Sequence, residues 1–121
     1  EVSYMHSEAF AAGELKHGPI ALIDTDTLVV GIATQKALYE KINSNMEEVK
    51  SRGAATLIIG QGDTSVFNGS ADTVITVPET EGMFAAIVSI IPVQLFAYYC
   101  SVLKGNNPDK PRNLAKSVTV E

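Results

Sequence analysis

Cysteine is almost absent from this 121-residue chain, which contains a single one, Cys100. A lone cysteine cannot close an internal disulfide, and no basic and apolar leader with a small-residue cleavage site opens the sequence. Both absences argue against an exported protein, so we expect a cytoplasmic location. Cys100 lies in a long apolar run, where a cysteine usually behaves as a small buried hydrophobe rather than a nucleophile.

Positive charge is also scarce, since nine Lys and Arg residues stand against fourteen Asp and Glu residues, for a net charge of −5. Such a chain has no general attraction to a phosphate backbone, so nucleic acid is not an expected partner. No Gly-rich phosphate loop of the GxGxxG or GxxxxGK type is found, and neither His6 nor His17 has a ligand at the spacing of a zinc site. We therefore expect no nucleotide cofactor and no metal.

Short apolar segments are what the sequence does contain, and three of them are typical of strands: 27–33, 55–59 and 73–77. The first, TLVVGIA, is rich in apolar and β-branched residues, which favours a strand buried on both faces. The segment 60–63 between the second and third reads as a turn at the end of a strand. Strands alternate with helical patterns, which predicts a three-layer α/β/α fold with a mostly parallel, flavodoxin-like sheet.

Apolar residues at three- and four-residue spacing predict two amphipathic helices. The second helix ends near Gly53, and its apolar face is formed by Leu38, Ile42, Met46 and Val49. The first is shorter, ends near Gly13, and presents Val2, Met5, Ala9 and Ala12. Because Glu1 already falls in this helical pattern, with neither a starting methionine nor a capping residue before it, we expect the chain to begin inside something larger.

The run 83–103 carries no formal charge and is long enough to cross a bilayer. Pro92 and Gln94 lie near its middle, and no basic residues flank its amino-terminal side. We interpret it as a buried, Pro-kinked helix of an α/β domain, and we expect no membrane partner.

Residue chemistry by itself leaves several candidates open. His17 precedes Gly18 and Pro19, which suits either a proton-transfer group on a loop or a histidine that hydrogen-bonds local backbone. Asp24 and Asp26 precede a strand instead of following its carboxyl end, which argues against a phosphoryl-accepting signalling domain. The end of the chain carries four basic residues, Lys104, Lys110, Arg112 and Lys116. They either bind an anion or are simply solvated surface charges.

Two motifs resemble the second sugar isomerase (SIS) subdomain of the glucosamine-6-phosphate synthase family. One is Ala11-Ala12-Gly13-Glu14-Leu15-Lys16-His17-Gly18-Pro19, preceded by Glu1-Val2-Ser3-Tyr4 and followed by Ala21-Leu22-Ile23-Asp24. The other is the tail Pro111-Arg112-Asn113-Leu114-Ala115-Lys116-Ser117-Val118-Thr119-Val120-Glu121. The first is shared with other SIS proteins, whereas the tail is close to a signature of the synthase. The resemblance implies an SIS subdomain over 1–104 and a tail over 105–121 that closes over the sugar site.

That family converts fructose 6-phosphate and glutamine-derived ammonia into glucosamine 6-phosphate. By position, Glu1 matches the carboxylate that moves a proton between C1 and C2, and His17 matches the histidine that opens the sugar ring across a dimer interface. Lys116 matches the lysine that forms a Schiff base with the open-chain ketose, and Ala115 lies beside the sugar. The resemblance implies no metal and no cofactor.

The resemblance also implies partners outside this sequence, namely a first SIS subdomain that holds the sugar phosphate, a glutaminase domain and a second subunit. We therefore expect the 121 residues alone to be inactive. The alternative is an SIS module that binds a phosphosugar without converting it. The tail lysine favours the enzyme, because a sensor does not need an imine-forming amine.

Overall fold

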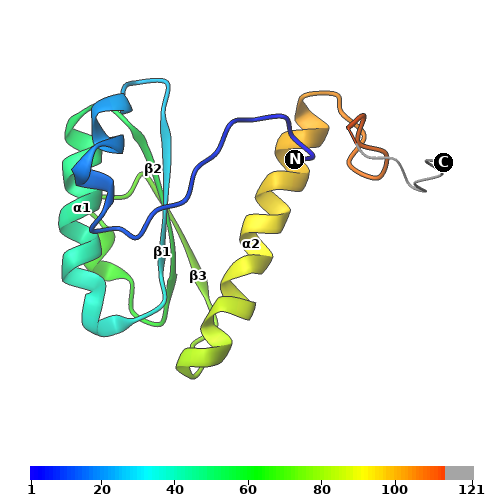
Figure 1. The fold of residues 1–121 in the computed structure, drawn as a ribbon. Coiled ribbons are helices and arrows are strands. Elements are labelled where there is room, and N and C mark those ends of the chain that lie inside the picture. Colours follow the sequence, from blue (N-terminus) through cyan, green and yellow to red (C-terminus); the bar gives the residue numbers. More distant parts are fainter. Residues whose placement is uncertain (114–121) are drawn as a thin grey trace. The chain divides into compact units, whose positions relative to one another are not determined.

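The computed structural model describes residues 1–113 of the chain (Figure 1). These residues divide into two compact units, which we describe separately. One is Ala9–Ile90, and the other joins Glu1–Glu8 to the residues from Ile91 onward. The boundary expected after residue 104 stays a prediction.

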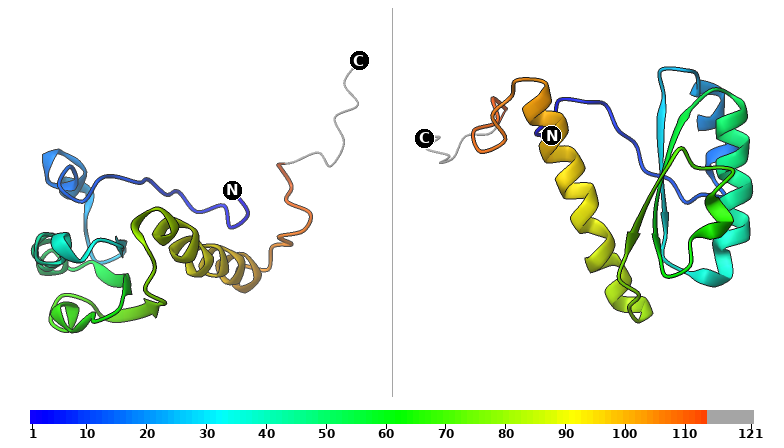
Figure 2. Two further views of the ribbon diagram at one scale, coloured as in Figure 1. Left: turned by 90° about the horizontal axis from the view of Figure 1, so that it is seen from below. Right: turned by 180° about the vertical axis from the view of Figure 1, so that it is seen from behind.

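The unit Ala9–Ile90 is built on a parallel three-stranded sheet. Its strands are β1 (Leu28–Ala33), β2 (Ala55–Gln61) and β3 (Thr73–Val77), and they follow one another in the order β1-β2-β3. Figure 2 shows from two further sides that the strands run in one direction, with α1 (Tyr39–Ser51) alongside them. The predicted α/β class with a parallel sheet is confirmed, and so are its three strands and the helix between the first two.

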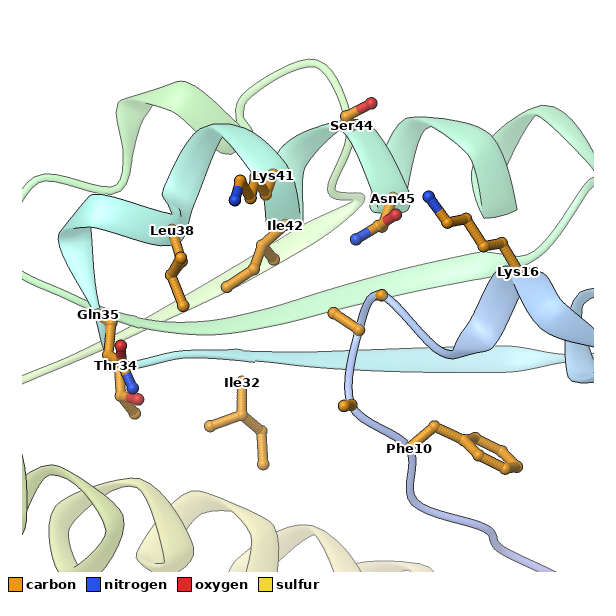
Figure 3. Close-up of a pocket in the computed structure, with 13 residues that line it drawn as sticks. Phe10, Lys16, Ile32, Thr34, Gln35, Leu38, Lys41, Ile42, Ser44 and Asn45 are labelled. Carbon is orange, nitrogen blue, oxygen red and sulfur yellow. The ribbon is translucent and has the colours of Figure 1, made fainter.

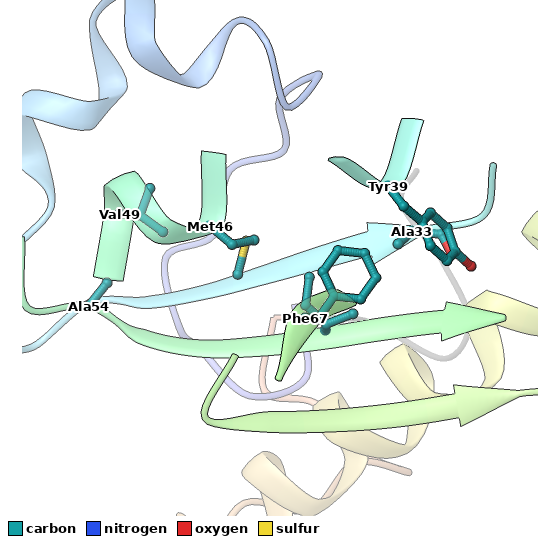
Figure 4. Packing of buried hydrophobic residues seen from close by; sticks show 7 residues of the cluster. Ala33, Tyr39, Met46, Val49, Ala54 and Phe67 are labelled. Atoms are coloured by element: carbon teal, nitrogen blue, oxygen red, sulfur yellow. The ribbon is translucent and has the colours of Figure 1, made fainter. Parts of the chain in front are cut away.

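The core of this unit lies between α1 and one face of the sheet (Figure 4). Its buried members are Ala33, Tyr39, Met46, Val49, Ala54, Ile58 and Phe67. The Tyr39 and Phe67 rings pack with their centroids 5.1 Å apart. The Tyr39 hydroxyl donates to the Gln61 carbonyl oxygen at 2.7 Å and accepts the Gln61 N–H at 3.0 Å. Because this phenol satisfies backbone groups at the end of β2, α1 and the sheet are joined by polar as well as apolar contacts.

β1 is not buried on both faces, which corrects the sequence prediction. Val29 and Ala33 pack in or against the core, whereas Leu28, Val30 and Ile32 alternate with them and are 43%, 37% and 48% exposed. Successive side chains of a strand point to opposite faces, so one face of this edge strand meets α1 and the other stays open. A continuous apolar run predicts a strand, but it does not determine whether one face or both faces of that strand are buried within this chain.

The close approach of α1 to β1 depends on Gly31. A Cβ built there would lie 2.5 Å from Ile58 Cδ1 and 3.1 Å from Met46 Sδ. We expect Gly31→Ala to lower the free energy of unfolding by about 1–3 kcal/mol, the usual cost of overpacking a core. Urea denaturation measures the effect, with Gly13→Ala as the control because a Cβ at Gly13 meets nothing within 4 Å. Equal unfolding free energies for the two variants would contradict this packing.

The longest helix is α2 (Gly82–Leu103), whose helical assignment continues through Pro92. Among the described residues it is the one helix long and apolar enough to cross a membrane by length and composition, with a mean hydropathy of 1.8 over its most apolar window. Only 11% of that window is buried, so the prediction of a buried helix is wrong for this chain taken alone. A three-stranded sheet of strands five to seven residues long already has one face under α1, and residues 1–113 hold few further elements to cover the apolar side chains of this 22-residue helix.

The first predicted helix is also absent, since residues 1–11 contain no helical segment. Regular structure starts at two 3-10 turns, η1 (Leu15–His17) and η2 (Pro19–Leu22). The spacing of Val2, Met5, Ala9 and Ala12 fits a helix, but a short segment with no cap gains too little from propensity alone. Tyr4, moreover, adopts a φ of +54°, which interrupts a right-handed helix.

Candidate functional site

His17 is the last residue of η1, on the exposed surface of the unit Ala9–Ile90. Its backbone N–H donates to the Glu14 carbonyl oxygen at 3.0 Å, which closes the turn. The next residue, Gly18, has a φ of +150° that a residue with a Cβ rarely adopts, and Pro19 then starts η2. The chain therefore changes direction directly after His17. The imidazole is carried on a fixed turn at the surface, as the proton-transfer interpretation requires.

Glu1 lies in the other unit, where the N-terminal segment runs along the end of α2. The Ser101 hydroxyl, which is fully buried, donates to the Val2 carbonyl oxygen at 2.8 Å. The Lys104 ammonium donates to the Tyr4 carbonyl oxygen at 3.4 Å. These bonds bridge about a hundred residues of sequence and hold the exposed Glu1 carboxylate beside the carboxyl-terminal end of α2.

The base of the C-terminal tail meets the same segment. The Tyr4 hydroxyl accepts the backbone N–H of Arg112 at 2.7 Å, and the Arg112 guanidinium lies 4.1 Å from the centre of the Tyr4 ring. The Asn113 amide approaches Glu1 Oε1 at 3.5 Å. Sequence patterns did not point to Tyr4, because its partners Lys104 and Arg112 lie 100 and 108 residues away.

The remaining predicted residues are not tested by this geometry. Ala115 and Lys116 lie outside the described residues. Glu1 and His17 belong to different units, so their participation in one site stays a prediction. Among residues 1–113, no group of three or more His, Cys, Asp or Glu side chains is placed to hold a metal ion.

A hollow of about 750 Å³ opens beside the carboxyl end of β1 (Figure 3). Its lining mixes apolar side chains such as Ile32 and Leu38 with Thr34 and two lysines, Lys16 and Lys41. Figure 3 shows Lys16 reaching toward Asn45 of α1 from the turn that precedes His17. His17 itself is not among the lining residues. Its neighbour Lys16 is, so the hollow borders the turn that ends at His17.

The carboxyl edge of the sheet, where open α/β folds usually bind ligands, carries an ion pair. Lys36 Nζ lies 2.7 Å from Glu79 Oε1, joining the loop after β1 to the loop after β3. Its hydrogen bond to the Glu79 carboxylate raises the pKa of Lys36 above the usual value. Lys36 is therefore already paired within the chain, which makes this lysine a poor candidate for binding a phosphate.

A second charged residue, Asp72, joins elements at the opposite end of the strands. Asp72 lies 2.9 Å from Lys50 Nζ and accepts hydrogen bonds from the Thr56 backbone N–H and hydroxyl at 2.8 and 2.9 Å. The Lys50 ammonium, together with the Thr56 donors, lowers the pKa of Asp72 to about 2. This carboxylate joins α1, β2 and the start of β3 and has a structural role.

Comparison with known proteins connects this geometry to a family. The model of the SIS domain family matches residues 1–104. The chain is 52% identical over all 121 residues to a protein of Clostridium tetani named glutamine–fructose-6-phosphate aminotransferase (isomerizing), and 50% identical to one so named from Pseudomonas putida. In both cases the match covers 100% of this chain and 20% of the relative, so the chain spans about a fifth of their length.

A solved structure agrees. The C-terminal domain of glucosamine-fructose-6-phosphate aminotransferase from Francisella tularensis superposes with a TM-score of 0.72 and 35% sequence identity, over 88% of this chain and 30% of that one. The resemblance seen in the sequence motifs is thus confirmed from the first residue to the last, and the chain belongs to the SIS domain family, matching the C-terminal part of the isomerizing aminotransferases.

Proposed function

We propose that this chain is the C-terminal part of the isomerase half of an enzyme that makes glucosamine 6-phosphate from fructose 6-phosphate and glutamine-derived ammonia. The observation that supports this most is the 52% identity to an isomerizing aminotransferase over all 121 residues. That span includes the tail from Pro111 to Glu121 as well as the turn that carries His17. Amino-sugar synthesis is the role that follows.

The proposed chemistry divides among three residues. The Lys116 amine condenses with the C2 carbonyl of the open-chain sugar and releases water, and the resulting iminium makes the protons on C1 more acidic. Ammonia then replaces the lysine at C2, which frees the amine and leaves the nitrogen of the product on the sugar. The Glu1 carboxylate moves a proton between C1 and C2 as a general base and acid. His17 opens the sugar ring and acts on the site of the partner subunit in a homodimer, while Ala115 lies beside the sugar. The exposed positions of Glu1 and His17 leave both side chains accessible to a substrate.

The sugar phosphate, in this proposal, is held mainly by the preceding SIS subdomain. The pairing of Lys36 with Glu79 at the carboxyl edge supports this division, because it leaves that cation engaged. The exposed apolar side chains of α2, including Met83 and Leu103 at 78% and 86% exposed, are covered by other protein of the parent enzyme rather than by lipid. Polar residues within α2, Ser89 and Gln94 among them, are costly to place in lipid and fit contact with protein. We place the enzyme in the cytoplasm.

The test is an assay of the full-length protein that contains this chain, supplied with glutamine and fructose 6-phosphate, beside the 121 residues alone. We expect glucosamine 6-phosphate from the full-length protein and no measurable turnover from the fragment, which lacks the phosphate-binding subdomain. If the full-length protein binds fructose 6-phosphate but forms no product, the alternative of a non-catalytic phosphosugar-binding module is correct instead. Turnover by the fragment comparable to that of an intact isomerase half would contradict the proposed division of the site.

A further inference from the structure

We propose that Tyr4 is a positioning residue that holds the base of the C-terminal tail beside Glu1. The inference rests on the proposed function, in which Glu1 and Lys116 act on one substrate. Lys116 follows Arg112 by four residues, and Glu1 precedes Tyr4 by three. A tyrosine that binds Arg112 therefore joins the two segments that carry the proton-transfer carboxylate and the imine-forming amine.

Tyr4 uses two kinds of contact to hold Arg112. Its hydroxyl accepts the Arg112 backbone N–H at 2.7 Å, a short distance for a bond of this type. The guanidinium of the same residue lies 4.1 Å from the ring centroid, within the range of a cation–π interaction. One contact fixes the tail backbone and the other fixes the side chain, so together they restrict both the position and the direction of the chain as it leaves Arg112.

The backbone of Tyr4 is itself held in an unusual conformation. Its φ of +54° is the one positive φ of a non-glycine residue among residues 1–113. Such a conformation is unfavourable for a tyrosine and persists when surrounding contacts impose it. The bonds from Ser101 to Val2 and from Lys104 to Tyr4 lie on either side of this point and anchor the segment to α2. Strain of this kind in a segment next to Glu1 agrees with a role in placing groups for catalysis.

The consequence for catalysis differs from that of a general loss of stability. Since the phosphate is held elsewhere in the proposed enzyme, loosening the tail leaves substrate affinity nearly intact. It lowers the fraction of enzyme in which the amine and the carboxylate are both in place, and that fraction enters kcat. Losing a single exposed hydrogen bond changes such a population by about threefold, and losing the ring contact as well increases the effect.

The test uses the full-length protein and two separable changes. Tyr4→Phe removes the acceptor but keeps the ring, whereas Arg112→Gln removes the cation but keeps the backbone N–H. Tyr99→Phe is the matched control, because Tyr99 lies on α2 and its ring packs against that of Tyr98, whereas Arg112 lies over Tyr4. Site-resolved hydrogen exchange reports on the Arg112 amide, and steady-state kinetics gives kcat and KM for fructose 6-phosphate.

We expect exchange at the Arg112 amide to become about threefold faster in Tyr4→Phe and to stay unchanged in Tyr99→Phe. Turnover should fall by a similar factor in Tyr4→Phe, with KM within twofold of the parent, and Arg112→Gln should also lower kcat. Unchanged exchange at Arg112 would overturn the contact, and faster exchange with unchanged kcat would overturn the positioning role. Should the parent protein have no isomerase activity, the proposed function fails, while the exchange measurement still decides whether Tyr4 holds Arg112.

Discussion

Replacing Glu1 by glutamine in the full-length protein should lower the rate of glucosamine 6-phosphate formation by about 10²- to 10⁴-fold. This is the usual contribution of a positioned general acid–base group. Glutamine has nearly the same shape as glutamate and keeps a polar side chain beside Asn113, but it cannot accept and return a proton at neutral pH. The loss should therefore appear in kcat rather than in KM for fructose 6-phosphate.

Glu8→Gln is the matched control for this change. Glu8 is an exposed carboxylate of the same N-terminal segment, and its Oε1 lies 3.6 Å from His6 Nε2. Its replacement should leave turnover within twofold. Glutamine hydrolysis, which the proposal assigns to another domain, should survive both substitutions and so shows that the protein is folded. A similar loss in both variants would mean that charge, rather than proton transfer by Glu1, is responsible.

Lys116→Ala should remove essentially all isomerase turnover, because no other group in the proposed site forms the iminium that acidifies the C–H bond. The measurement is product formation from fructose 6-phosphate, with an equilibrium binding assay to show that the sugar phosphate is still held. Lys110→Ala is the control, since Lys110 is an exposed cation of the same tail. If Lys110→Ala were equally inactive, the loss would come from removing positive charge from the tail, and the iminium role of Lys116 would be contradicted.

The parts of the fold that sequence predicted correctly depend on short-range patterns. All three strands were located from short apolar runs rich in β-branched residues, and α1 was located from apolar residues three and four positions apart. Met46 and Val49, which were placed on the apolar face of α1, are indeed buried.

The errors arise where a pattern has more than one structural outcome. The apolar residues of β1 and α2 predict that both elements are buried in the native protein. They do not say whether the burying residues belong to this chain, and the exposed side chains of Leu28, Val30 and Ile32 show that one face of β1 is not buried by the described residues. Helical spacing near the N-terminus was outweighed by tertiary contacts. Val2 and Tyr4 give their carbonyl oxygens to donors at the end of α2, and an α-helix would use those oxygens internally.

Contacts between residues at opposite ends of the chain could not be predicted from local sequence patterns. Nothing in the spacing of residues near Glu1 indicates that Tyr4 binds Arg112, which lies 108 positions away. The family resemblance supplied roles for Glu1, His17 and Lys116 but no role for Tyr4. Only the arrangement in space connects the N-terminal segment to the tail.

The central claim is that this chain carries the imine-forming lysine of a phosphosugar isomerase, and borohydride trapping tests it most directly. The full-length protein is incubated with fructose 6-phosphate, reduced and digested, and the sugar adduct is located by mass spectrometry. We predict an adduct on Lys116 that is lost in Lys116→Ala and retained in Lys110→Ala. An active enzyme that traps the sugar on another lysine, or on none, would contradict the account.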